Sequence, residues 1–263
     1  MSIIEAIILG LIQGLTEFVP VSSSGHLLLI QDVFGSEIGL TFDVALHIGT
    51  LLSLLLIFRR DIVELTKALF KRSEKTGLAI LLAIATVPAV IAGTLLQEAA
   101  ETTFRSPIIV AIMLILVGVL MLVAERWTVR HQNKNALEHV SWRQAVIIGT
   151  AQAIAIIPGT SRSGSTITAG LFAGLDRVTS TRFSFLLAIP VMLGATLKVM
   201  LSEYSMGLVA DTPGIFIIGV IVAFLTGLFA IRFLLSFLSR HSLATFAYYR
   251  MGLGGIVLLL VLI

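Results

Sequence analysis

The chain has 263 residues, of which 57% are hydrophobic and 13% charged, and its mean hydropathy is +1.04. This composition excludes an ordinary soluble domain and predicts an integral protein of the lipid bilayer. Its 18 basic and 15 acidic residues leave a net charge of only +3, so we expect no nucleic-acid partner. With no cysteine, the sequence excludes disulfides, thiol catalysis and cysteine-ligated metal.

The apolar segments form two similar series along the chain. The first series opens with Ile3–Ile30 and the second with Ala145–Leu175, and each of these segments is broken in its middle by Pro, Gly and Ser. Uninterrupted apolar runs follow each broken segment, and about 20 such residues cross a bilayer as a helix. The six predicted transmembrane helices are Thr41–Phe58, Leu78–Gln97, Pro107–Ala124, Phe183–Leu201, Gly214–Ser236 and Phe246–Ile263. We therefore predict one all-α polytopic membrane domain over residues 1–263.

The basic residues between the spans predict the topology. Lys and Arg gather in Arg59–Gly77 and Glu125–Arg143, which the positive-inside rule places on the cytoplasmic side. The segments Gln31–Leu40, Glu98–Ser106 and Ser202–Pro213 hold few of them and are expected outside. Six spans alternate correctly, with both termini outside, only if each broken segment returns to the side from which it entered. We therefore expect two re-entrant helix pairs, because broken backbone at membrane depth is tolerated where it lines a site inside the protein.

The two broken segments also resemble each other in sequence. A shift of 139 positions gives seven identities within 20 positions, namely Ala6 with Ala145, Ile8 with Ile147, Gly10 with Gly149, Gln13 with Gln152, Ser22 with Ser161, Ser24 with Ser163 and Gly25 with Gly164. One interpretation is coincidence between two stretches rich in small residues. We favour a duplication, because the two segments are predicted to enter from opposite sides and each precedes three spans. The predicted fold is an inverted-topology repeat with halves at about 1–130 and 140–263 and a site near the midplane.

The break in the second half carries the pattern of a phosphate-binding site. It places Gly159, Ser161, Arg162, Ser163 and Thr166 between apolar runs, in a chain that otherwise keeps charge out of such runs. Small residues let backbone N–H groups converge, the hydroxyls add donors, and the arginine offers a planar charged fork. A helix that begins near Ser163 adds its positive end. The alternative is a helix break with capping serines and an arginine that reaches the interface.

The break in the first half supplies the carboxylate and imidazole that the second lacks. Gln13 and Glu17 are four residues apart and share one helix face. If a helix resumes at Ser22 or Ser23, then Ser23 and His26 share a face as well, and the imidazole can accept the hydroxyl proton. Taken singly, each residue fits capping or helix-to-helix hydrogen bonding equally well. Their occurrence together opposite an arginine and hydroxyl cradle favours catalysis.

These two motifs resemble the signature motifs of the bacterial undecaprenyl-pyrophosphate phosphatases, also called bacitracin-resistance proteins, and the resemblance covers the whole chain. It implies an enzyme that hydrolyses undecaprenyl pyrophosphate to undecaprenyl phosphate and inorganic phosphate, which recycles the cell-wall lipid carrier and gives bacitracin resistance. It also implies a divalent cation, Mg²⁺ or Ca²⁺, and a multi-pass position in the bacterial cytoplasmic membrane with the active site facing the periplasm or outside. The oligomeric state is left open, with a homodimer as one option.

The resemblance also assigns roles to residues. Ser23, His26 and Glu17 are catalytic, with Ser23 attacking the terminal phosphorus and His26 orienting or deprotonating it, and His26 as nucleophile remains the alternative. The residues expected to bind substrate are Ser22, Gly159, Ser161, Arg162, Ser163 and Thr166. Glu17 is the expected metal ligand, helped by position 13. Many members have glutamate at position 13, so Gln13 leaves a metal held by two carboxylates in doubt.

Two further interpretations remain at this point. Inverted repeats, broken helices and a midplane anion site also suit a transporter or flippase of an anionic lipid, although such a protein needs no nucleophile beside a base. Asp43 and His47, four residues apart, either support the site or form an interfacial pair, and we favour the interfacial pair. Lys198 and Arg232 lie near span ends and are expected to reach the interface.

Overall fold

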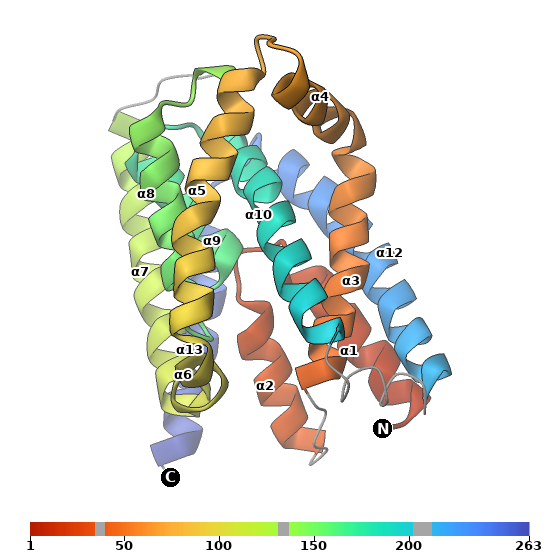
Figure 1. Ribbon diagram of the computed structural model, residues 1–263. Helices are drawn as coiled ribbons and strands as arrows, with labels where there is room; N and C mark the ends of the chain where they lie inside the picture. Colours follow the sequence, from red (N-terminus) through yellow and green to blue (C-terminus); the bar gives the residue numbers. More distant parts are fainter. Residues whose placement is uncertain (35–39, 131–136, 202–211, 263) are drawn as a thin grey trace.

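A computed structural model describes residues 1–34, 40–130, 137–201 and 212–262, and every regular element within these ranges is helical (Figure 1). The helices are α1 (Ile3–Thr16), α2 (Ser23–Phe34), α3 (Leu40–Ile57), α4 (Arg59–Phe70), α5 (Thr76–Leu95), α6 (Gln97–Glu101), α7 (Pro107–Arg130), α8 (Trp142–Ile154), α9 (Arg162–Phe172), α10 (Arg177–Met200), α12 (Pro213–Leu238) and α13 (Ala244–Leu262). Two short 3₁₀ turns, Thr103–Arg105 and Leu137–His139, complete the described elements. The expected all-α fold is confirmed.

The long helices agree with the predicted spans. Five helices, α5, α7, α10, α12 and α13, are long and apolar enough to cross a membrane, and α3 makes a sixth if it is taken together with α4, which is bent from it by 78°. Helix α4 falls in the predicted loop Arg59–Gly77 and was not expected. It forms because Ile62, Leu65 and Ala68 lie on one face and pack on the core while its charged residues face outward. The predicted outer loops Gln31–Leu40 and Ser202–Pro213 lie largely outside the described residues.

Both broken segments are helix pairs with the break where it was expected. Residues 17–22 separate α1 from α2, and residues 155–161 separate α8 from α9. Figure 1 shows α1 and α2 at the end of the bundle that carries both chain termini, and α8 toward the opposite end, where α4 lies. Helices α1 and α8 begin in the same manner, because Ser2 with Glu5 and Ser141 with Gln144 each form a capping box.

The first helix of each series packs against the second span of the other series, since α1 lies on α12 and α8 lies on α5. Glycine allows both close approaches. A Cβ on Gly10 would lie 2.8 Å from the carbonyl oxygen of Gly219, and one on Gly149 would lie 2.4 Å from that of Ala85. The first helix of each series is therefore packed closely on a span of the other series.

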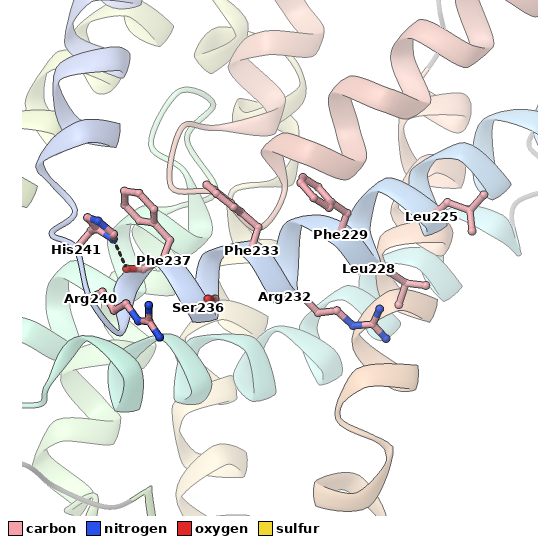
Figure 2. A pocket seen from close by; sticks show the side chains of 9 residues that line it. All are labelled: Leu225, Leu228, Phe229, Arg232, Phe233, Ser236, Phe237, Arg240 and His241. Carbon is pink, nitrogen blue, oxygen red and sulfur yellow. Dashed lines mark hydrogen bonds between the residues drawn. The ribbon is translucent and has the colours of Figure 1, made fainter.

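The core lies around both helix breaks, and the outward faces of the long helices are apolar. Phe18, beside the first break, is fully buried and packs edge-to-face on Phe185 of α10. On the outer side of α12, the rings of Phe229, Phe233 and Phe237 follow one another along the helix and end at His241, as Figure 2 shows. Such exposed apolar and aromatic side chains are expected where a helix faces lipid. The core, in contrast, holds the two breaks in fixed positions.

Candidate active site

The two helix breaks meet inside the bundle, and a direct ion pair joins their motifs. Arg162, the first residue of α9, donates from Nη2 to Glu17 Oε1 at 2.8 Å, although the two residues are 145 positions apart. The hydroxyl of Ser163 lies 3.4 Å from the carbonyl oxygen of Val19, to which it donates. The expectation that these two motifs form one site therefore agrees with the geometry.

Each break turns at a serine in an unusual backbone conformation. Ser22 has φ of 75° and Ser161 has φ of 70°, and they are the non-glycine residues with positive φ in the described parts of the chain. Each hydroxyl accepts from the backbone N–H of the glycine three residues later, at 3.3 Å for Gly25 and 3.1 Å for Gly164. Each serine therefore caps the helix that follows its break and aims the start of that helix at the site.

Glu17 is the centre of the site. Its carboxylate is 7% exposed and accepts from Gln13 Nε2 at 3.1 Å and from the Ser23 hydroxyl at 2.7 Å, in addition to Arg162. His47 Nε2 lies 3.6 Å from the same carboxylate. The local sequence favours an interfacial pair for Asp43 and His47, whereas the fold brings His47 to Glu17. Nothing in the local sequence could have shown otherwise, because α3 brings His47 to Glu17 only through the tertiary fold.

His26 is bound by partners other than Ser23. Its Nδ1 lies 2.8 Å from the carbonyl oxygen of Ser22, and its Nε2 lies 2.8 Å from the hydroxyl of Tyr249. A carbonyl oxygen can only accept, so Nδ1 carries the hydrogen and the Nε2 of a neutral ring accepts from Tyr249. The two rings are also nearly parallel, with centroids 5.7 Å apart. The expected hydrogen bond between Ser23 and His26 is therefore absent, and Ser23 pairs with Glu17 instead.

The second motif divides into side chains that face the site and side chains that support it. Arg162 Nη1 and Thr160 Oγ1 are buried and have no hydrogen-bond partner within the described residues. Thr166 has partners of its own, since its hydroxyl donates to the Arg162 carbonyl oxygen at 2.7 Å and lies 2.6 Å from the Ser184 hydroxyl. The free donors suit an anion, whereas Thr166 is held within the protein.

Gly159 shapes the loop and has no side chain to contribute. It has φ of 88°, and a Cβ there would lie 2.4 Å from the carbonyl oxygen of Val110. Only glycine therefore fits between this loop and α7.

The residues around Glu17 fit a divalent cation. Oε1 of Gln13 is buried and has no hydrogen-bond partner, so one amide oxygen is available beside the carboxylate. His47 donates from Nδ1 to the Asp43 carbonyl oxygen at 2.8 Å, so Nε2 is the ring nitrogen that faces Glu17. No group of three His, Asp or Glu residues with metal-binding geometry occurs in the described parts of the chain. A cation here would thus depend on the glutamine and on substrate oxygens as ligands.

The fold and this site define a polytopic membrane protein in which two broken helices bring their polar motifs together. The family model described as bacitracin resistance protein BacA matches residues 6–256. An undecaprenyl-diphosphatase of Thermodesulfovibrio yellowstonii is 48% identical, with 97% of this chain and 96% of the relative covered. Proteins of the same name from Rubrobacter xylanophilus and Gemmatimonas aurantiaca are 44% and 43% identical, with at least 97% of each chain covered. The chain belongs to the bacitracin resistance protein BacA family.

Besides His47, two residues of the site were missed by sequence reasoning, namely Tyr249 and Arg250 of α13. Arg250 lies inside the predicted span Phe246–Ile263, and it contradicts the statement that the chain keeps charge out of its other apolar runs. A lone arginine in a predicted span is itself a signal of function. The sequence contained this signal, although no motif drew attention to it.

Proposed function

We propose that this protein hydrolyses undecaprenyl diphosphate to undecaprenyl phosphate and inorganic phosphate, and so recycles the lipid carrier of cell-wall synthesis and gives bacitracin resistance. The names of its relatives support this activity. The observation that carries the proposal is the ion pair between Arg162 and Glu17, because it puts a phosphate-binding cation next to a serine whose hydroxyl already donates to a carboxylate.

The mechanism follows from the partners of Ser23. Its oxygen attacks the terminal phosphorus in line, and its proton passes to Glu17 over the existing hydrogen bond of 2.7 Å. The bond between this phosphorus and the bridging oxygen breaks, and undecaprenyl phosphate leaves. Water then attacks the phosphoserine, the Ser23 oxygen leaves and takes back the proton held by Glu17, and the phosphate departs with the proton of the water. Ser23 is favoured over His26 as nucleophile, because the Nε2 of His26 is engaged by Tyr249.

Charge on the transferring group is stabilised by the second motif. The unpartnered Nη1 of Arg162 and hydroxyl of Thr160 are free to donate to phosphate oxygens, and the start of α9 directs its N–H groups to the same place. Ser161 and Ser163, whose hydroxyls lie 3.3 Å apart, shape this cradle. His26 is left to orient the attacking water or the leaving phosphate.

A divalent cation, Mg²⁺ or Ca²⁺, would be held by Glu17 and Gln13, and His47 is an additional ligand that the sequence did not suggest. When bound, it supplies neutralisation of the diphosphate charge. Oε1 of Gln13, which has no partner, supports this assignment. Binding of Mn²⁺, followed by electron paramagnetic resonance of the purified protein, tests it without reference to activity.

The two broken segments are proposed to be re-entrant pairs of an inverted repeat. Three features that recur after 139 positions support this, namely the capping boxes at Ser2 and Ser141, the positive φ of Ser22 and Ser161, and the interlocking of α1 and α8 with the opposite half. The chain has no cysteine, so single cysteines can be introduced directly. Cysteine at Ser2 should react with an impermeant thiol reagent from outside intact cells, and cysteine at Trp142 only after the membrane is opened.

The protein is proposed to lie in the cytoplasmic membrane, with its site open to the periplasm or the outside. The basic residues of Arg59–Gly77 support a cytoplasmic position for the opposite end. Cysteine at Lys71 should therefore be protected from the same reagent in intact cells. Light scattering in detergent would distinguish the homodimer, left open by the sequence, from a monomer.

The activity is tested by phosphate release from farnesyl and undecaprenyl diphosphate by the detergent-purified protein with Mg²⁺, Ca²⁺ or chelator. We expect metal-dependent release that is lost in Ser23→Ala and Arg162→Ala and reduced in His26→Ala. Arg232→Ala, which removes an exposed arginine outside the site, should retain activity. If folded wild-type protein releases no phosphate with any metal, the hydrolase is rejected, and lipid transport in liposomes becomes the test of the flippase alternative.

A further inference from the structure

Arg250 of α13 is fully buried, and its guanidinium donates to backbone carbonyls of both motif loops. Nη2 lies 2.6 Å from the Gly159 oxygen and 2.9 Å from the Thr160 oxygen in the second loop. Nη1 lies 3.4 Å from the Pro20 oxygen in the first loop. Nε lies 3.0 Å from the Leu114 oxygen of α7, so the same side chain ties both loops to one span.

These contacts use the guanidinium completely. Nη2 also lies 3.4 Å from the Met113 oxygen, and Nη1 lies 3.8 Å from the sulfur of Met121. Arg250 therefore has no donor left for a phosphate and cannot act as a direct ligand in this arrangement. Its influence on a substrate must pass through the loops that it holds.

The charge of Arg250 has no carboxylate partner within the described residues, because all its oxygen ligands are backbone carbonyls. Burial of a charge without a counter-ion costs several kcal/mol, so a neutral side chain of similar size would be expected here if packing alone mattered. An anionic ligand between the two loops would supply the missing negative charge. The buried cation thus favours the loaded site over the empty one.

The positions of the bound carbonyls show which part of each loop Arg250 holds in place. Pro20 lies two residues before Ser22, and Thr160 lies directly before Ser161, so Arg250 binds the chain just ahead of both positive-φ serines. The Thr160 carbonyl belongs to the same peptide unit as the Ser161 N–H, so Arg250 fixes the orientation of the peptide that leads into Ser161. In the first loop its contact with the Pro20 carbonyl holds the Pro20–Val21 peptide, whose N–H donates to the Val19 oxygen at 2.7 Å. One guanidinium thereby sets the conformation of both breaks together.

We propose that Arg250 is the positioning residue of this site, which holds the two motif loops in register so that their donors converge on the diphosphate. This rests on the proposed hydrolase function. The role is distinct from those of Glu17 and Arg162, because Arg250 acts on the loops and does not touch the reacting atoms.

The test compares Arg250→Lys with the wild type in the purified full-length protein. Lysine keeps the charge but cannot reach carbonyls on two loops and a span from one planar group. A misplacement of about 1 Å can reduce turnover by about 10²-fold, so we expect kcat for farnesyl diphosphate to fall by about that factor. The inhibition constant for orthovanadate, which mimics the transferring phosphoryl group, should rise by at least about tenfold while KM changes less.

Arg177→Lys is the matched control, because Arg177 is an arginine with most of its side chain buried, held by Glu125 through bonds of 2.9 and 2.6 Å at the start of α10, away from the motifs. It should lower the melting temperature and leave kcat and vanadate inhibition unchanged. If Arg250→Lys behaves like Arg177→Lys, with kcat and the vanadate constant within twofold of wild type, Arg250 is only structural and the proposal is wrong.

A second variant covers the case in which Arg250→Lys does not fold. A Cβ on Gly164 would lie 2.8 Å from Arg250 Nη1 and 3.1 Å from Cβ and Oγ of Ser161, so Gly164→Ala crowds the guanidinium, which keeps its charge, together with the Ser161 cap. It should weaken inhibition by vanadate in the same direction, and unchanged inhibition would overturn the proposal. Phosphate release by the wild type decides the hydrolase function separately. The increase in melting temperature on adding vanadate needs no turnover, and it should be smaller in Arg250→Lys than in the wild type even if no phosphate is released.

Discussion

The Ser23 hydroxyl donates to Glu17 Oε2 at 2.7 Å, and this bond is the geometric basis for proposing Ser23 as nucleophile and Glu17 as its base. The sequence predicted His26 in that role, because residues three apart share a helix face. Ser23 is the first residue of α2, however, so its side chain reaches back across the break to Glu17, directly after the end of α1. Arg162 donates to the other carboxylate oxygen, so the carboxylate lies between the proposed nucleophile and the proposed phosphate-binding cation.

The pair should act as a unit in catalysis. Ser23→Ala removes the nucleophile and Glu17→Gln removes its base, and general-base catalysis is worth about 10²- to 10⁴-fold. We expect kcat to fall by about 10³-fold in each single variant. The kcat of the double variant should be no lower than that of the less active single variant, because the two groups serve one step. Steady-state phosphate release measures this. Losses that multiply in the double variant would show that the two residues act independently.

Tyr249 should tune His26 without being essential. Tyr249→Phe keeps the ring stacked on the imidazole but removes the hydroxyl 2.8 Å from Nε2. A hydrogen bond of this kind contributes about 0.5–1.5 kcal/mol, so kcat/KM should fall by about two- to tenfold. Tyr248→Phe is the control, since the neighbouring Tyr248 is 62% exposed and makes no hydrogen bond within the described residues. An equal loss in both variants would mean that the hydroxyl of Tyr249 has no specific role.

Gln13 should limit the affinity for the cation. Gln13→Glu puts a second carboxylate beside Glu17, and the number of charged ligands sets the affinity for hard cations. We expect about tenfold tighter Mn²⁺ binding, a lower melting temperature without metal because two carboxylates then repel each other, and recovery of stability when Mg²⁺ is added. Gln13→Met, which removes the amide oxygen, should bind Mn²⁺ more weakly than wild type. Equal Mn²⁺ affinity in all three proteins would place the cation elsewhere.

The features that could be predicted from the sequence are those that depend on local sequence patterns. Apolar runs predicted the spans, and the shift of 139 positions that matched Ser22 with Ser161 also matches their backbone conformations and helix caps. The sequence did not assign His47, Tyr249 and Arg250 to the site, because α3 and α13 bring them to the motifs only in the packed tertiary structure. Helix α4 was missed for another reason, since its charged residues obscured a narrow apolar face. The partner of Ser23 depended on where a helix begins, and helix boundaries are the least certain feature of a sequence.

Because Ser161 has a positive φ, we expect glycine to be more stable than alanine at this position, the reverse of the order inside a helix. Alanine at this position loses the cap to Gly164 and keeps the backbone strain, which is about 1–2 kcal/mol for a residue with a Cβ. Glycine loses the same cap but relieves the strain, so Ser161→Gly should be more stable than Ser161→Ala by about 1 kcal/mol. At Ser165, inside α9, the order should reverse, because glycine is about 1 kcal/mol worse than alanine in a helix interior. Thermal unfolding of the four variants in one detergent checks both orders, and alanine more stable than glycine at both positions would show that the backbone at Ser161 is not strained.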